Sequence, residues 1–138
     1  MSQDPIQISR KITNQLLHLA QTSPDIEICG LIGSRDGQPC SCYPIMNVAE
    51  QPQQRFQLDA SQQISAMTSM RDSGEELFAF FHSHPTSPAT PSINDLTLTA
   101  YPEALNLIIS LNTKGVLEIR GFKINHQSAE ELELSLSA

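Results

Sequence analysis

Residues 82–95 of the chain read HSHPTSPATPSIND, and this stretch guides the interpretation of the whole sequence. It follows the apolar run 76–81 (ELFAFF), which is typical of a buried strand. His82 and His84 are separated by one residue, so on an extended chain both imidazoles point to the same face. Imidazoles bind divalent transition metals, and Asp95, at the start of a following helix, can supply a third ligand. Three protein ligands leave a fourth position for water, which is the pattern of a catalytic zinc site.

Each part of this site also has a plainer interpretation. A His-x-His pair alone is more often a surface or hydrogen-bonded pair than a metal site. The segment from Ser92 to Asp95 fits a capping box at a helix start, although a capping serine can still face a metal site. Glu27 could be a solvated strand residue. However, its neighbours Ile26 and Ile28 are apolar and face the opposite side of the strand, and a carboxylate is rarely buried without a partner.

Helical periodicity of apolar residues occurs twice before this stretch. It predicts helices over 8–23 and 58–71, with Ser9 capping the first and Asp59 or Ser61 capping the second. The apolar side chains expected on one face of the second helix are Ile64, Met67 and Met70. A third, short helix is expected to begin at Ser92.

Short β-branched and aromatic runs predict the strands, and they outnumber the helices. The expected strands cover residues 26–33, 42–48, 76–81, 105–111, 116–119, 121–124 and 132–136, and turns are expected at 35–37 and 114–115. The last two of these strands are expected to close the sheet. The predicted fold class is therefore α+β, with a mixed central sheet flanked by helices, in a single domain that spans residues 1–138.

The spacing of the motif resembles the signature of the JAMM (MPN+) zinc metalloprotease family. In that signature His-x-His is followed by seven residues, then Ser, two residues and Asp, and residues 82–95 match every defining position. Residues 27–33 (EICGLIG) resemble the family's Glu-x-Cys-Gly-Leu-x-x-Gly strand. Further similarity to the small stand-alone bacterial members lies at Asn47, at 55–58 (RFQL), at 101–102 and at 107–111, so the resemblance spans about residues 7–124.

This resemblance implies the cytidine-deaminase-like MPN/JAMM fold and a role for each motif residue. His82, His84 and Asp95 would hold Zn²⁺, with water completing the coordination. Glu27 would be the general base that takes the proton of the water and passes it to the leaving amine. Ser92 would hydrogen-bond the developing oxyanion or the water. The implied reaction is hydrolysis of an amide or isopeptide bond.

The implied substrate of the small bacterial members is a ubiquitin-like sulfur carrier of the ThiS/MoaD type, which ends in Gly-Gly. Such an extended tail would fit a narrow groove beside the metal, because glycines allow close approach of the backbone. One alternative is a non-enzymatic MPN scaffold that binds a ubiquitin-like partner. Another is a RadC-like protein, although the chain lacks room for RadC's N-terminal helical domain. A zinc deaminase does not fit, because residues 39–42 (PCSC) precede the histidines and are one residue short of Pro-Cys-x-x-Cys.

Composition narrows the partners and the compartment. The chain has 8 Lys and Arg against 15 Asp and Glu, for a net charge of −7, which argues against nucleic acid and anionic membranes as partners. Three cysteines cannot all pair, so we expect free thiols in a reducing, cytoplasmic location. Cys29 is expected in the core, and Cys40 and Cys42 are too few for a metal site of their own.

Overall fold

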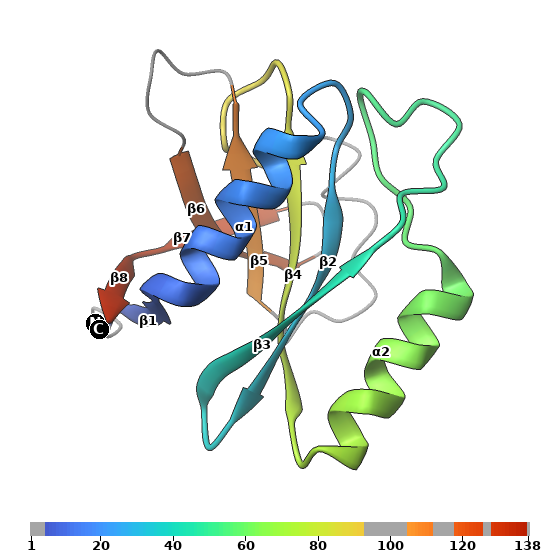
Figure 1. Ribbon diagram of the computed structural model, residues 1–138. Coiled ribbons are helices and arrows are strands. Elements are labelled where there is room, and N and C mark those ends of the chain that lie inside the picture. The colour runs from blue at the N-terminus through green and yellow to red at the C-terminus, as the bar shows by residue number, and fades with distance from the viewer. Residues whose placement is uncertain (1–4, 93–104, 112–117, 126–127, 138) are drawn as a thin grey trace.

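The computed structural model describes residues 5–92, 105–111, 118–125 and 128–137 (Figure 1). The elements in chain order are β1 (Ile6–Ser9), α1 (Arg10–Thr22), β2 (Cys29–Arg35), β3 (Gln38–Ile45), α2 (Ala60–Asp72), β4 (Glu76–His84), β5 (Leu105–Ser110), β6 (Glu118–Asn125), β7 (Ser128–Leu132) and β8 (Leu134–Ser137). Among these residues no helix has the length and apolar character needed to cross a bilayer.

Six strands form a mixed sheet in the order β3-β2-β4-β5-β6-β7. The pair β4–β5 is parallel, and the other neighbouring pairs are antiparallel. This arrangement confirms the predicted α+β class with a mixed central sheet. Strand β4 lies between β2 and β5, so its backbone is hydrogen-bonded on both sides.

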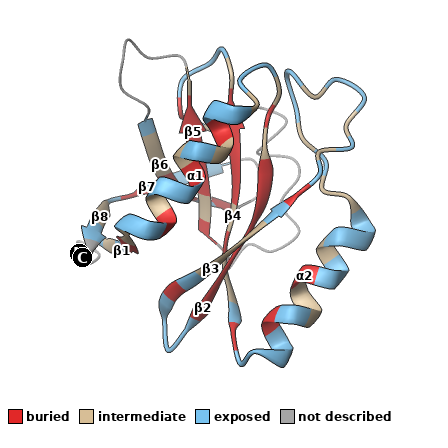
Figure 2. Ribbon diagram, viewed as in Figure 1, coloured by how far each residue is buried: buried red, intermediate tan, exposed pale blue. Residues whose placement is uncertain are grey.

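The two helices pack on opposite faces of the sheet, and Figure 1 shows α1 crossing in front of β4 and β5. Neighbouring residues of β2 show this, because Leu31 packs on the side of α2 and Ile32 packs on the side of α1. The side chains of Ala79 and Phe81 on β4 also belong to the α1 side. Successive side chains of a strand point to alternate faces of the sheet. His82 and His84 therefore lie on the face opposite to Ala79 and Phe81. Buried residues are concentrated in the central strands β2, β4 and β5 (Figure 2).

The helix caps agree with the sequence. The Ser9 side chain accepts a hydrogen bond from the amide of Ile12 (3.2 Å), and Asp59 caps α2 by accepting from the amide of Gln62 (2.9 Å). The predicted turn at 35–37 joins β2 to β3, and its positive φ angles at Asp36 (53°) and Gly37 (79°) are those of a type I′ hairpin.

The predicted apolar face of α2 is correct at Met67 and Met70 and wrong at Ile64. Ile64 is 67% exposed, whereas Ala66 and Met70 are buried and Met67 is half-buried. The physical reason is the helical period. Residues 64 and 70 are six positions apart and therefore lie about 120° apart around the helix, so the three residues do not form one stripe.

Several predicted boundaries also shift. Strand β2 begins at Cys29, three residues later than expected, and β3 covers residues 38–45 rather than 42–48. Strand β4 continues through the two histidines. The expected strands at 116–119 and 121–124 are one strand, β6, within the described residues, and the helix expected from Ser92 and the turn at 114–115 fall outside them.

Residues 132–136 were expected to form a strand that closes the main sheet, but the C-terminal strand does not do so. Leu132 ends β7 in the main sheet, and the chain then forms β8 in a separate two-stranded sheet. There β8 pairs in parallel with β1, which the sequence analysis did not predict, and Ile6 and Ile8 lie opposite Leu134 and Leu136.

Candidate metal centre

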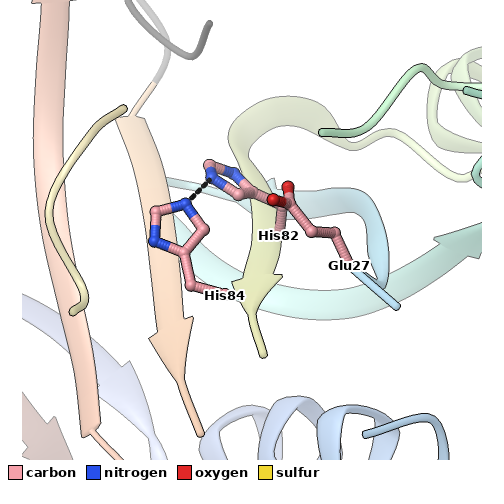
Figure 3. Close-up of side chains that lie close together, drawn as sticks. All are labelled: Glu27, His82 and His84. Atoms are coloured by element: carbon pink, nitrogen blue, oxygen red, sulfur yellow. Dashed lines mark hydrogen bonds between the residues drawn. The ribbon is translucent and has the colours of Figure 1, made fainter. Parts of the chain in front are cut away.

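The two histidines lie at the carboxyl end of β4. The imidazole Nε2 atoms of His82 and His84 face each other at 3.2 Å, and both residues are almost fully buried (Figure 3). Strand β4 pairs with β2 on one side and β5 on the other, and His82 lies opposite Cys29 and Ile108 in these ladders. The ladders on both sides of β4 therefore fix the backbone positions from which the two rings project.

Glu27 completes the cluster from a different segment, just before β2. Its carboxylate and the two imidazoles place one ligand atom each within 4.8 Å of one another, and all three residues are buried. Figure 3 shows the Glu27 side chain directed toward His82. Among the described residues this is the group of His, Cys, Asp and Glu side chains that is arranged to hold a metal ion.

The donor set fits a tetrahedral metal such as zinc. Two nitrogen ligands at the usual zinc–nitrogen distance lie about 3.3 Å apart in a tetrahedron, close to the observed 3.2 Å. Nδ1 of His84 lies 2.7 Å from the carbonyl oxygen of Pro88, and because a carbonyl can only accept, Nδ1 carries the proton. In neutral His84 the Nε2 atom therefore presents its lone pair to the site.

The loop after β4 is anchored so that it can hold His84. Ala89 is fully buried against Ile108, Phe122 and Ile124, which fixes the loop next to the carbonyl that His84 contacts. The hydroxyl of Ser110 donates a hydrogen bond to the carbonyl of Ser87 (2.8 Å) in the same loop. The sequence analysis assigned no role to residues 85–91 and missed this support.

Three other contacts around the histidines were also missed. The ring of Phe56 stacks on His82, with 4.3 Å between centroids and 23° between planes. Ser83, between the two histidines, accepts a hydrogen bond from the amide of Ile28 at its hydroxyl (2.9 Å) and donates its own amide to the Ile28 carbonyl (3.0 Å). The resemblance marked residues 55–58 but gave Phe56 no role, and the serine had no signal of its own.

Cys29 lies two residues from Glu27 and is buried, as predicted for a small core residue. Burial and, to a lesser extent, the charge of Glu27 raise the pKa of its thiol to about 12. At neutral pH the thiol is therefore protonated, and it donates to the carbonyl of Ile45 (3.3 Å). Cys40 and Cys42 are free thiols, and within the described residues they belong to no metal-type cluster.

Two motif residues remain, Ser92 and Asp95. Ser92 is half-buried at the end of the loop after β4. Asp95, expected as the third ligand, lies in residues 93–104, outside the described residues.

Comparison with protein families finds one match over most of the chain. Residues 9–123 match the family of prokaryotic homologs of the JAB domain. A protein of Haloferax volcanii named desampylase is 31% identical over 93 residues, which are 66% of this chain and 67% of that protein. A CysO-cysteine peptidase of Mycobacterium tuberculosis is 28% identical over 115 residues, covering 82% of this chain and 77% of the peptidase.

Solved structures give the same picture of the fold. A protein from Desulfitobacterium hafniense superimposes with a TM-score of 0.85 and 32% identity, over 95% of this chain and 92% of that one. A JAB1/MPN domain protein from Archaeoglobus fulgidus superimposes with a TM-score of 0.64 at 18% identity, over 99% of this chain and all of that one. The predicted MPN/JAMM fold is thus confirmed.

Proposed function

This chain belongs to the family of prokaryotic homologs of the JAB domain, and from that premise we propose that it is a zinc-dependent peptidase acting on the tail of a ubiquitin-like protein. It is an enzyme, as its relatives named desampylase and CysO-cysteine peptidase are. The observation that carries the proposal is the convergence of Glu27, His82 and His84 on one buried point. The proposed reaction is hydrolysis of the amide bond after a C-terminal Gly-Gly.

His82 and His84 would hold the zinc ion through their Nε2 atoms, and Asp95 would be the third protein ligand. When bound, zinc supplies Lewis acidity to the site. The Nδ1–H of His84 donates to the Pro88 carbonyl, which keeps its ring oriented and its Nε2 available. The ring of Phe56 stacks on the imidazole of His82 and covers one of its faces.

Glu27 is the proposed general base. Its carboxylate is buried, and it lies within 4.8 Å of the ligand atoms of both histidines, so it can reach a water molecule that approaches them. It would accept the proton of the attacking water on a carboxylate oxygen and then deliver it to the nitrogen of the leaving amine. Ser92 would donate its hydroxyl to the oxygen of the scissile carbonyl as negative charge develops there.

The substrate class follows from the family resemblance and from the names of the relatives. A sulfur carrier of the ThiS/MoaD type has a flexible Gly-Gly end, and the absence of side chains there lets the backbone enter a narrow site. The adduct on that tail would be cysteine or another amine, released as the free amine together with the carrier carboxylate.

The test uses a ThiS/MoaD-type carrier joined through its Gly-Gly end to cysteine or to a short peptide. Mass spectrometry should show release after the second glycine, loss of release with a chelator, and recovery with Zn²⁺. A carrier with a bulkier residue in place of its penultimate glycine should resist cleavage. Equal cleavage of arbitrary unstructured peptides would indicate a general peptidase, and zinc binding without cleavage of any carrier would favour the scaffold alternative.

A further inference from the structure

The proposed base is held differently from the proposed ligands. His82 and His84 belong to β4, which is hydrogen-bonded in ladders on both sides. Glu27 precedes the first residue of β2 and lies outside the regular strand. Its amide donates to the carbonyl of Pro52 (2.7 Å), and its carbonyl accepts from the side-chain amide of Asn47 (3.0 Å). Both partners come from the segment 47–58, between β3 and α2.

Asn47 uses its whole amide group to hold this segment. Its Nδ2 donates to the carbonyls of Glu27 and Arg55, each at 3.0 Å. Its Oδ1 accepts from the amides of Ala49 and Gln57, also at 3.0 Å each. An asparagine side chain offers two donor hydrogens and one acceptor oxygen with two lone pairs, so these four bonds use its full capacity.

We propose that Asn47 is a positioning residue that sets the location of Glu27 relative to the two histidines. It acts directly through the Glu27 carbonyl, and indirectly by folding the segment whose Pro52 carbonyl receives the Glu27 amide. The inference rests on the proposed role of Glu27 as base. Because Glu27 has no strand ladder at its own backbone, these two bonds take the place of one.

The same segment also reaches the histidine side of the site. Phe56 lies between two residues that Asn47 binds, Arg55 and Gln57, and its ring stacks on His82. However, His82 is fixed independently by β4. Loss of Asn47 should therefore move Glu27 while leaving the separation of the two imidazoles unchanged.

The first experiment separates turnover from metal binding. In Asn47→Ala we expect kcat to fall about 10-fold or more, because a displacement of about 1 Å at a reacting group can cost up to about 100-fold. Zinc content and zinc affinity should stay close to those of the parent. Gln54→Ala, at an exposed position of the same segment, is the matched control and should change neither quantity. Parent-like kcat in Asn47→Ala, or loss of zinc together with activity, would overturn the proposal.

A second variant tests which half of the amide matters. Asn47→Asp keeps an oxygen for the amides of Ala49 and Gln57 but replaces the donor that binds the carbonyls of Glu27 and Arg55. A positioning role predicts that kcat falls in Asn47→Asp as well. If Asn47→Asp kept the kcat of the parent, the residue would serve only to fold the segment.

Amide hydrogen exchange tests the placement of Glu27 without any substrate. In Asn47→Ala the Glu27 amide should exchange about 10-fold faster or more, because its acceptor at Pro52 is no longer held. Amides of β4 should keep their protection, as should all amides in Gln54→Ala. This readout stands even if no carrier is cleaved, so failure of the proposed substrate and failure of the positioning role are distinguishable. Unchanged exchange at Glu27 would overturn the positioning role.

Discussion

Buried polar side chains gather at both ends of β4, and the two clusters differ in how their polar atoms meet. Just before the strand, the carboxylate of Glu75 accepts hydrogen bonds from the hydroxyls of Ser41 (3.1 Å) and Tyr43 (3.0 Å). At the other end, the Nε2 atoms of His82 and His84, the proposed metal ligands, face each other. The first cluster pairs donors with an acceptor, whereas in the second the Nε2 of neutral His84 presents a lone pair toward the Nε2 of His82.

This difference separates a structural cluster from a functional one. Glu75 is held by a compact hydrogen-bond network with Ser41 and Tyr43 of β3. A Cβ atom on Gly33 would lie 2.2 Å from the Glu75 Oε1, so a larger residue there would push the carboxylate out of its place. With the proton of His84 fixed on Nδ1, a neutral pair of rings needs either a proton on the Nε2 of His82 or a cation between them. Substitutions at the two ends should therefore separate stability from activity.

The largest effect is expected from His84→Ala. It removes one of the proposed protein ligands, so zinc content should fall well below about one per chain and hydrolysis should fall to background. The unfolding transition in urea should change little by comparison, because the site is not the main hydrophobic core. His18→Ala, an exposed histidine on α1, is the matched control. Full zinc and full activity in His84→Ala would show that the ligand assignment is wrong.

The next effect is expected from Glu27→Gln, which removes the proposed base while keeping the size of the side chain. Turnover should drop about 100-fold or more while zinc stays bound, because general base catalysis contributes about 100-fold to 10,000-fold. Zinc content by atomic absorption and kcat on the same sample measure the two quantities. Glu50→Gln, at an exposed position, serves as the control. If zinc and activity were lost together, Glu27 would be a ligand rather than a base.

Much of this site follows from local sequence, and the part that does not is long-range. The histidine pair is carried by one strand, so its geometry is set by alternation along that strand and can be inferred from spacing alone. The contact of Glu27 with the pair depends on a partner 55 residues along the chain. No rule of local structure brings residue 27 to residue 82. Only the family resemblance placed Glu27 at the site.

The fold shows the same division. Caps at Ser9 and Asp59 and the hairpin at 35–37 depend on neighbouring residues, and they were predicted correctly. The parallel pairing of β1 with β8 joins the two ends of the chain, and short terminal strands carry no local signal for it. Likewise, Asn47 was expected only as part of a strand at 42–48, and its four hydrogen bonds to the segment and to Glu27 become visible only in three dimensions.

At the structural end of β4, Glu75→Ala should lower stability rather than activity. The hydroxyls of Ser41 and Tyr43 would lose their acceptor, which costs about 2 kcal/mol in the free energy of unfolding. The nearby Arg35 guanidinium, at 3.7 Å from the carboxylate, is 57% exposed and adds little to this cost. Urea unfolding gives the stability, and zinc content should match the parent. Glu76→Ala, an exposed neighbour, is the control, and loss of zinc in Glu75→Ala would contradict the separation of the two ends.

The smallest effect is expected from Tyr43→Phe, which removes one hydroxyl from the same network and should cost about 1 kcal/mol at neutral pH. Burial, followed by the hydrogen bond to Glu75 and its charge, raises the pKa of Tyr43 in the folded protein. Above about pH 10 the unfolded tyrosine therefore loses its proton first, and stability falls as pH rises. Tyr43→Phe lacks this loss, so the difference in unfolding free energy between parent and variant should shrink between neutral pH and about pH 10.5. A difference that grows over this range would mean that Tyr43 does not donate to Glu75.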